Sequence, residues 1–443
     1  MASITAAGAG SGLNVEGIVS GLMSVERQPL TKLQTQASKY NTQVSDIGKL
    51  TSALSSLKTA AQKLSSYDFL DANTASSSDT TIIGIKADGT ATNGTYAINT
   101  TQMASPQADV FDLSGMSADG KLTFGTDSTS PATITVNGKS VNLGTGTVTL
   151  TPAELAAKIN SAGVGATAMS ITDKTGQQRL VITGQKTGAT DGVLGATSFD
   201  TLSSGNATLN ATASQAPKNA EFTINGISAV SQSNSISDLV SGLTFTLQKP
   251  GVASVTVGRD DDAIAKKVDD FVTSYNAVVA QLTSMKSGSF GNDSLLRSVK
   301  DQLYAAVSAP TDKTNANPGP ADYSPLANFG IKLGVGGSLV FNKSDFTKAL
   351  GKNADAVKAA FASNAEGVTG TVNNLTDPDK GLVTNRKSTL DANVKANTSK
   401  QDLMSAQLVK TEARLRAQYG ALDASLTKMQ TSLASMKSML GIS

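Results

Sequence analysis

The sequence predicts an α+β multidomain protein. Both chain ends build a helical-bundle or coiled-coil stalk, and β-rich head domains are inserted between them. Three observations support this fold class. Both ends carry apolar residues at alternating steps of three and four, which is typical of helices packed in bundles. The middle of the chain alternates short β-type runs with Gly, Asn, Asp and Ser turns. At 443 residues the chain is long enough for several domains.

The first helical stretch is GLNVEGIVSGLMSVERQPLTKL, residues 12–33, and no core lies near it in the sequence. Pro29 suits the first turn of a helix, and the residue before a proline is pushed out of helical geometry. We therefore predict a short mobile segment up to about Gln28 and a true stalk helix from Pro29 onward. From Tyr40 to Leu64 apolar residues recur at bundle spacing, so we expect this part of the helix to pack within the chain.

The middle of the chain, from about Asn73, reads as strands. Asn137-Gly138 and Asn225-Gly226 are hairpin signals, because both central residues of a type I′ turn need positive φ. TPAELAAKINSAG, residues 151–163, predicts a short helix that stops at a glycine. A weak internal repeat predicts strand, turn, strand, short helix, strand twice over, with SISDLVSGL, residues 235–243, as the second helix.

Helical periodicity resumes at Asp260, where DDDAIAKKVDDFVTSYNAVVAQL has acidic residues in its first turn. A Pro/Asn/Gly-rich loop at 309–325 is followed by a pattern for a β-hairpin with a helix behind it. The C-terminal end then has a long apolar stripe, which needs a partner because it would otherwise lie in water. The stripe consists of Leu408, Leu415, Tyr419, Leu422, Leu426, Met429, Leu433, Met436 and Leu440.

Composition excludes several kinds of chemistry. The chain has no Cys and no His, so it cannot form a disulfide, a thiolate nucleophile or a Ser-His-Asp triad. The glycine-rich start at 8–12 lacks the context of a phosphate loop, and Asp260 to Asp262 fit helix capping better than a metal site. We therefore expect no catalytic residue, no metal and no cofactor. A net charge of +2 and scattered basic residues disfavour nucleic acid, and no apolar run is long enough for membrane insertion.

Three blocks stand out in the sequence. The first is GSGLNVEGIVSGLMSVERQPLTKLQTQ, the second is GLTFTLQKPG at 242–251 with the helix after it, and the third is residues 326–361. These blocks, in this order, resemble the flagellar hook-associated protein 2 family, the bacterial flagellar filament cap proteins. Residues 153–168 also resemble a short repeat of flagellin and hook-associated proteins. The stretch that matches least is 106–216.

The resemblance implies a secreted structural protein rather than an enzyme, exported unfolded through the flagellar type III channel. It implies a ring-shaped homo-oligomer at the distal filament tip, which helps exported flagellin to fold and insert. Its partners would be copies of itself, flagellin, hook–filament junction proteins and an export chaperone on the C-terminal helix; some members are also reported to adhere. The first segment's Leu13, Ile18, Leu22 and Val25 should then pair with the C-terminal stripe or with filament subunits.

We divide the chain accordingly. Segments 1–40 and 405–443 are terminal helices that we expect to be disordered until assembly. Segments 41–72 and 260–404 form the helical stalk with a small β-hairpin, 73–105 and 217–259 form a β-rich plate, and 106–216 form an outer β-rich head. The alternative functions are a surface adhesin, with its activity in the β-rich region 73–259, and another axial protein such as a hook–filament junction component.

Overall fold

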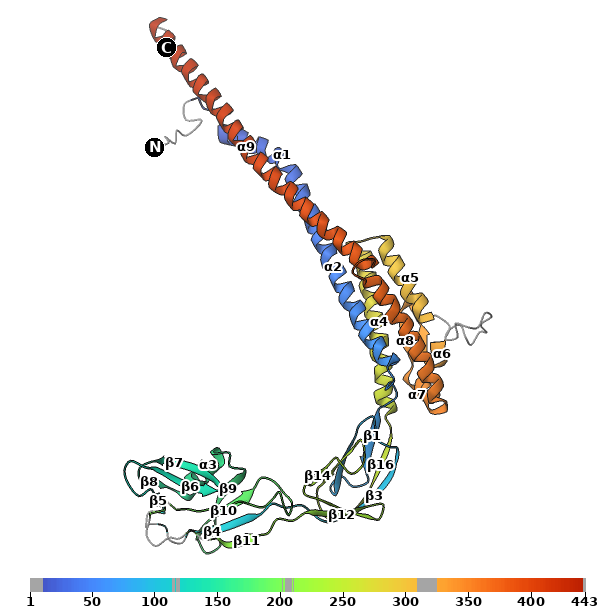
Figure 1. Cartoon of the computed structure of the whole chain (residues 1–443). Coiled ribbons are helices and arrows are strands. Elements are labelled where there is room, and N and C mark those ends of the chain that lie inside the picture. The colour runs from blue at the N-terminus through green and yellow to red at the C-terminus, as the bar shows by residue number, and fades with distance from the viewer. Residues whose placement is uncertain are drawn as a thin grey trace. The chain divides into compact units, whose positions relative to one another are not determined.

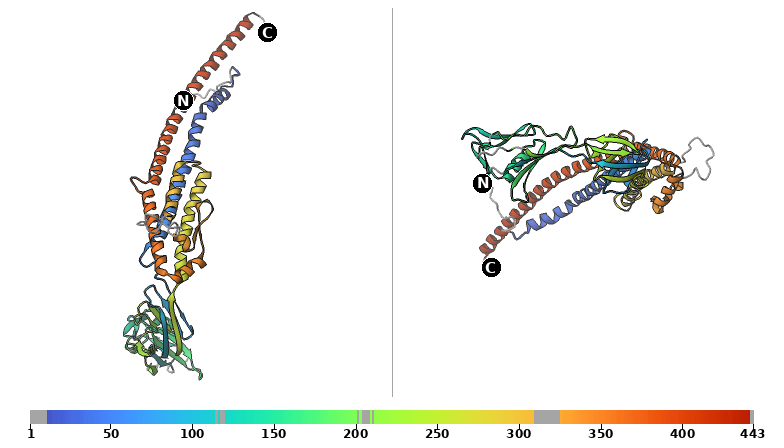
Figure 2. Two further views of the ribbon diagram at one scale, coloured as in Figure 1. Left: turned by 90° about the vertical axis from the view of Figure 1, so that its right-hand side faces the viewer. Right: turned by 90° about the horizontal axis from the view of Figure 1, so that it is seen from below.

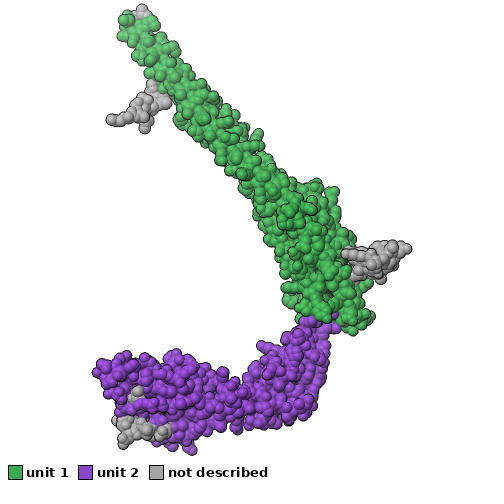
Figure 3. All heavy atoms as spheres, viewed as in Figure 1, with its two compact units in different colours: residues 1–69, 262–443 green, residues 70–261 purple. Residues whose placement is uncertain are grey.

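The structure is a computed structural model that describes residues 11–113, 116, 120–200, 202–203, 209, 211–308 and 325–440. The chain divides into two compact units (Figure 3). Unit 1 consists of residues 1–69 and 262–443, and unit 2 consists of residues 70–261. Helices from both chain ends therefore flank an inserted β-rich region, and the predicted fold class is confirmed.

The regular structure of unit 1, over the residues described, is helical apart from one small β-hairpin (Figure 1). Its two longest helices come from opposite ends of the chain and have 38 and 59 residues. The helices are α1 (Val15–Glu26), α2 (Gln28–Ser65), α4 (Asp261–Ser287), α5 (Ser294–Ser308), α6 (Pro325–Asn328), α7 (Lys343–Lys352), α8 (Ala354–Thr376) and α9 (Leu382–Leu440). The predicted hairpin consists of β17 (Ile331–Leu333), the 3-10 turn η1 (Val335–Gly337) and β18 (Leu339–Phe341), and α7 follows it.

The break near Pro29 is present, but the prediction for Gln28 was wrong. Gln28 is the first residue of α2, and the interruption falls at Arg27, which itself has helical φ and ψ of −78° and −15°. Pro29 stands in the first turn of α2, where a missing N–H costs least. The Arg27 N–H bonds the Met23 carbonyl at 3.0 Å and the Arg27 carbonyl accepts the Thr31 N–H at 3.1 Å, so helical hydrogen bonds flank the interruption on both sides.

The core of unit 1 forms where α2 packs with α4, α8 and α9. The stripe predicted on α2 is its main contribution, since the side chains of Ile47, Leu50, Leu54 and Leu57 are fully buried. Aromatic rings close one end of this core, with the rings of Phe69 and Phe361 5.8 Å apart. The intramolecular packing expected from Tyr40 to Leu64 is thus confirmed from Ile47 onward, whereas Tyr40 and Val44 are only half-buried.

Unit 2 contains two separate hydrophobic cores. The first is bordered by a five-stranded antiparallel sheet, in the order β1-β16-β3-β12-β13, and by a three-stranded sheet, β14-β15-β2. These strands are β1 (Asn73–Ser77), β2 (Ile83–Ala87), β3 (Gly94–Gln102), β12 (Ala220–Ile224), β13 (Ile227–Ser231), β14 (Ser235–Ile236), β15 (Leu243–Leu247) and β16 (Gly251–Arg259).

The second core of unit 2 lies between a four-stranded sheet, β11-β4-β10-β9, two hairpin-like pairs and one helix. The helix α3 (Pro152–Ser161) is the one predicted, and Thr151 and Glu154 form a capping box at its start. The strands are β4 (Ala108–Asp112), β5 (Leu122–Phe124), β6 (Pro131–Val136), β7 (Lys139–Thr145), β8 (Val148–Leu150), β9 (Ala166–Thr172), β10 (Gln178–Gly184) and β11 (Ala211–Gln215).

Both predicted Asn-Gly hairpins are present, with Asn137 and Asn225 at φ of 52° and 51°. The predicted second helix of the repeat is not. Residues 235–243 form the two-residue strand β14 and a turn that ends at Gly242, which has a φ of 74°. A segment this short and this rich in serine cannot offset the cost of helix nucleation, whereas α3 has a capping box and a buried face.

Candidate functional site: the paired chain ends

The two ends of the chain meet on one surface of unit 1, where α1 lies alongside α9 (Figures 1 and 2). Glu16 contacts Arg416 and Arg27 contacts Glu412, so the two helices run antiparallel. Asn14 caps α1, because its side-chain oxygen accepts the Gly17 N–H at 2.8 Å. The two ionic contacts join residues that are 400 and 385 positions apart in the sequence.

A small apolar cluster joins α1 to α9. Only four side chains in it are buried: Val15, Val19 and Met23 from α1, and Leu408 from α9. Val15, Val19 and Met23 are spaced by four residues and therefore lie on one face of the helix. Around them lie partly buried residues, namely Leu13, Leu30, Met404, Leu415 and Tyr419.

A charged network flanks the cluster. The Arg416 guanidinium donates to both carboxylate oxygens of Glu16 at 2.6 and 2.8 Å, and it also contacts Glu412 at 3.1 Å. Arg27 reaches the other oxygen of Glu412 at 3.4 Å. The hydrogen bond from Arg416 lowers the pKa of Glu16 below its ordinary value. Because these groups are solvent-exposed, the network contributes more to the register of the two helices than to their stability.

The pairing continues for a short distance beyond the start of α1. Ser11 donates a hydrogen bond to the Asp423 carboxylate, and Gln430 donates to the Ser11 carbonyl at 3.2 Å. Among the described residues, no other chain segment covers α9 after this point. The apolar stripe nevertheless continues, with Leu422, Met429, Leu433 and Met436 at 46, 58, 54 and 53 % exposed.

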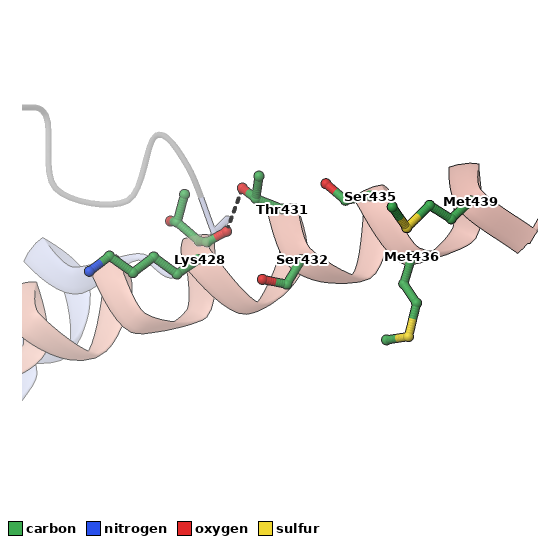
Figure 4. A pocket seen from close by; sticks show the side chains of 7 residues that line it. Lys428, Thr431, Ser432, Ser435, Met436 and Met439 are labelled. Atoms are coloured by element: carbon green, nitrogen blue, oxygen red, sulfur yellow. Dashed lines mark hydrogen bonds between the residues drawn. The ribbon is translucent and has the colours of Figure 1, made fainter.

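Figure 4 shows this uncovered end of α9. A shallow hollow runs along it, lined by hydroxyl side chains, Lys428 and two methionines, and the side chain of Met436 projects from the helix into open space. Thr431 bonds the carbonyl of Thr427 within the helix at 2.8 Å, so its hydroxyl is satisfied locally. Exposed apolar residues in a continuous row are typical of a surface that binds another protein.

The structure brings together only part of the predicted interface. Leu13, Leu408, Leu415 and Tyr419 meet in the cluster, and Leu426 is half-buried. The other predicted residues of α1 do not face α9: Ile18 is half-buried, and Leu22 and Val25 are 40 and 61 % exposed. The side chain of Leu440 lies outside the described residues, as do residues 1–10 and 441–443.

The residues that do join α1 to α9 are Val15, Val19 and Met23, which the prediction did not select. Their four-residue spacing was a usable signal. The same segment also carries Ile18, Leu22 and Val25 on the adjoining face, so its sequence alone could not show which face packs inside the chain.

A polar stretch separates this cluster from the core of unit 1. On α9, no apolar side chain is fully buried between Leu390 and Leu408, and the inward position is held by Asn397, which is 4 % exposed. Gln401 donates to the Asn397 side-chain oxygen at 2.6 Å. On α2, likewise, no described apolar residue before Ile47 is fully buried. We call this stretch, residues 31–44 of α2 and 391–403 of α9, the polar neck.

The described residues hold no group of three or more acidic side chains placed to bind a metal ion, and no described helix is long and apolar enough to cross a membrane. One cleft of about 370 Å³ lies between α4, α5 and the turn at Gly336. Its lining combines the apolar Val279, Leu282 and Leu296 with the charged Lys286, Arg297, Lys300, Asp293 and Asp301. Of the two carboxylates, Asp293 is paired with Arg386 at 2.6 Å.

Comparison with protein families identifies two matching regions. The family model for the N-terminus of flagellar hook-associated protein 2 matches residues 11–107, and the model for the C-terminus of the same protein matches residues 217–431. Together they cover α1, α2, the first core of unit 2 and nearly all of the remaining helices. The stretch between them, residues 108–216, contains the second core of unit 2.

Full-length relatives agree with the family models. The chain is 27 % identical over 481 residues to flagellar hook-associated protein 2 of Aeromonas caviae, with 99 % of this chain and 98 % of the relative covered. It is 26 % identical to the protein of that name in Escherichia coli K12, with 97 % of each chain covered. It is also 26 % identical to the A-type protein of Pseudomonas aeruginosa, with 95 and 94 % covered.

Among solved structures, the chain is similar to the D1-D2-D3 domains of the flagellar cap protein FliD from Escherichia coli. The TM-score is 0.53 at 22 % identity, and the alignment covers 78 % of this chain and 99 % of the other. At this level of identity the likeness concerns the fold. It extends to the arrangement of helices around inserted β-rich domains.

Proposed function

Because this chain belongs to the flagellar hook-associated protein 2 family, we propose that it caps the distal end of a bacterial flagellar filament and promotes the folding and insertion of exported flagellin subunits. Its role is structural rather than enzymatic. It is exported and then assembles as a ring of identical copies. Its partners are flagellin, the hook–filament junction proteins and, before export, a chaperone that holds the C-terminal helix.

One observation in the structure supports the mode of action most directly. The apolar stripe on α9 extends beyond the part that α1 covers. α1 covers the stripe from Leu408 to Tyr419, and the exposed residues from Leu422 to Met436 continue the same row along α9. An amphipathic helix binds a groove through residues at such spacing. We therefore propose that filament or neighbouring cap subunits cover this stretch, and that the chaperone covers it before export.

The exposed face of α1 extends the same proposal. Leu22 and Val25 point away from α9 and are open to solvent although the helix is packed. We propose that they contact a filament subunit and not the same chain. The terminal segments 1–40 and 405–443 would then gain most of their order on assembly, since few apolar residues in the described parts of these segments, residues 11–40 and 405–439, are buried within the chain.

The test of the function is a deletion strain that expresses variants of the chain from a plasmid. We expect the deletion to give short or missing filaments and flagellin monomer in the medium, and the wild-type chain to restore growth. A strain that made normal filaments without the gene would contradict the proposed cap function.

The test of the stripe uses a matched pair of substitutions on α9. Met429→Asp places a charge on the stripe, whereas Ala424→Asp places the same residue on the opposite side of the helix. We expect the first variant to be exported and folded but to fail in capping, and the second to cap normally. If Met429→Asp capped as well as Ala424→Asp, the stripe would not be the contact surface, even though the family function would stand.

A further inference from the structure

Three Asn-Gly dipeptides occur in the chain, all in unit 2: Asn93-Gly94, Asn137-Gly138 and Asn225-Gly226. This dipeptide can rearrange without an enzyme, because the backbone nitrogen of glycine is not shielded by a Cβ and can attack the asparagine side chain. The attack requires the side-chain carbon to approach that nitrogen closely and from the right direction. The fold therefore decides which of the three dipeptides reacts.

Asn137 is held away from this geometry. Its side-chain nitrogen donates to the Val164 carbonyl at 2.8 Å, and its side-chain oxygen accepts the Gly195 N–H at 2.7 Å. It also occupies the left-handed region, at a φ of 52°, in the turn between β6 and β7. The nitrogen and the oxygen of the Asn137 side chain are thus both bonded to backbone groups elsewhere in unit 2, and the side chain cannot fold back onto Gly138 without breaking both hydrogen bonds.

Asn225 is restrained in a similar way. Its side-chain oxygen accepts the Ala97 N–H at 2.8 Å, and its own N–H donates to the Ala97 carbonyl at 2.8 Å. The turn between β12 and β13 holds it at a φ of 51°. The side chain is exposed but tied to the central strand β3.

Asn93 has no comparable restraint. It is exposed, it is not in the left-handed region, and its side chain makes no hydrogen bond to another residue that the structure describes. The backbone on either side of it is fixed, since the Tyr96 hydroxyl donates to the Thr92 carbonyl at 2.9 Å and Gly94 pairs with Val257. The unrestrained part of this segment is the reactive side chain.

We propose that Asn93 is a site of spontaneous deamidation in the folded protein, and that Asn137 and Asn225 are protected by the fold. The Gly94 nitrogen bonds to the side-chain carbon of Asn93, the bond from that carbon to its amide nitrogen breaks, and ammonia leaves with the proton from Gly94. Water then opens the five-membered succinimide at either carbonyl. One route leaves an ordinary aspartyl residue in place of the asparagine, and the other leaves its isoaspartyl isomer.

The reaction has a structural consequence at the first residues of β3. The isoaspartyl product inserts an additional backbone carbon between Thr92 and Gly94, both of which are held in place. One of these contacts must therefore shift. Either product also adds a negative charge to unit 2, in which 15 Asp and Glu already exceed 10 Lys and Arg.

The test is incubation of the full chain in mildly alkaline buffer, with peptide mapping by mass spectrometry at intervals and enzymatic methylation to detect isoaspartate. We expect Asn93 to convert at least about tenfold faster than Asn137 or Asn225, because the hydrogen bonds of the other two must first break. The same incubation in concentrated urea should bring the three rates together. Equal rates in the folded protein, or unequal rates that persist in urea, would overturn the proposal.

Gly94→Ala provides the matched control. A Cβ at this position meets no atom within 4 Å, and Gly94 does not need the left-handed region, so the variant should fold normally. The added methyl group hinders attack by the backbone nitrogen. We expect conversion at Asn93 to fall by about tenfold or more while Asn137 and Asn225 are unchanged. Unchanged conversion at Asn93 would refute the mechanism.

Discussion

Leu408→Ala should release α1 from α9 without unfolding unit 1. Leu408 is the only buried contribution of α9 to the cluster that holds α1, alongside Val15, Val19 and Met23. Truncation removes three carbons, each worth about 0.8 kcal/mol when buried, and the site lies at a surface that can partly refill, so we expect a loss of about 2–3 kcal/mol. Since 1.4 kcal/mol corresponds to a factor of ten, the opening equilibrium of α1 should shift by about 30- to 140-fold.

The assay is hydrogen exchange followed by mass spectrometry. Peptides from residues 15–26 should exchange faster by that factor, whereas peptides from residues 47–64 in the core should not change, because the polar neck separates the two. Leu403→Ala is the matched control, since Leu403 lies on the same helix but is 67 % exposed. If α1 kept its protection, or if the core lost protection in parallel, the cluster would not be an independent unit.

Three further predictions concern charge and the polar neck. Because Arg416 lowers the pKa of Glu16 from its ordinary value of 4.5, the attraction between them is present above that value and is lost as the pH falls through the lowered pKa. The protection factors of α1, which are corrected for the slower intrinsic exchange in acid, should therefore fall as the pH is lowered, and Glu16→Gln should remove this dependence; an acid response that survived the substitution would show another cause. Asn397→Leu should raise the free energy of unfolding of unit 1, measured by urea denaturation, by about 1 kcal/mol, because it buries an apolar side chain in place of a polar one; a fall would show that the Gln401 hydrogen bond outweighs packing. Unit 1 has 27 Lys and Arg against 20 Asp and Glu, so two copies that associate through unit 1 repel each other electrostatically. Added salt screens this repulsion and should therefore strengthen self-association, measured by sedimentation. If salt weakened self-association instead, unit 1 of one copy would be in contact with the acidic unit 2 of another.

The elements that could be predicted from sequence are those whose signals are local. The period of the apolar residues identified α2 and α9, and Asn137-Gly138 and Asn225-Gly226 fixed two hairpins, because each dipeptide supplies the positive φ that its turn needs. Capping residues identified α3 in the same way. Where the local signal was weak, as in SISDLVSGL, periodicity alone favoured a helix, and the tertiary structure overrode it.

The candidate site was harder to predict because it depends on contacts between the two chain ends. Apolar residues lie on two adjoining faces of α1, and only the antiparallel partner shows that the face of Val15, Val19 and Met23 is the inner one. The network around Arg416 joins residues about 400 positions apart, so no spacing in the sequence could indicate it. The apolar stripe on α9 could be recognised from the sequence. The point at which α1 stops covering this stripe could not.

The place on α9 where α1 stops covering the apolar stripe matters for assembly. A stripe fully covered by α1 would offer nothing to another subunit, and a stripe fully open would aggregate, because a long row of exposed apolar residues associates without selectivity. Here α1 covers the part around Leu408 with three buried side chains of its own, and charges at Glu16 and Arg416 fix its register. The open part begins at Leu422, next to the point where Ser11 meets Asp423. A partner that binds the open part can therefore extend along the same seam, and the weak hold of α1 lets the chain end adjust to it while the polar neck keeps the core of unit 1 intact.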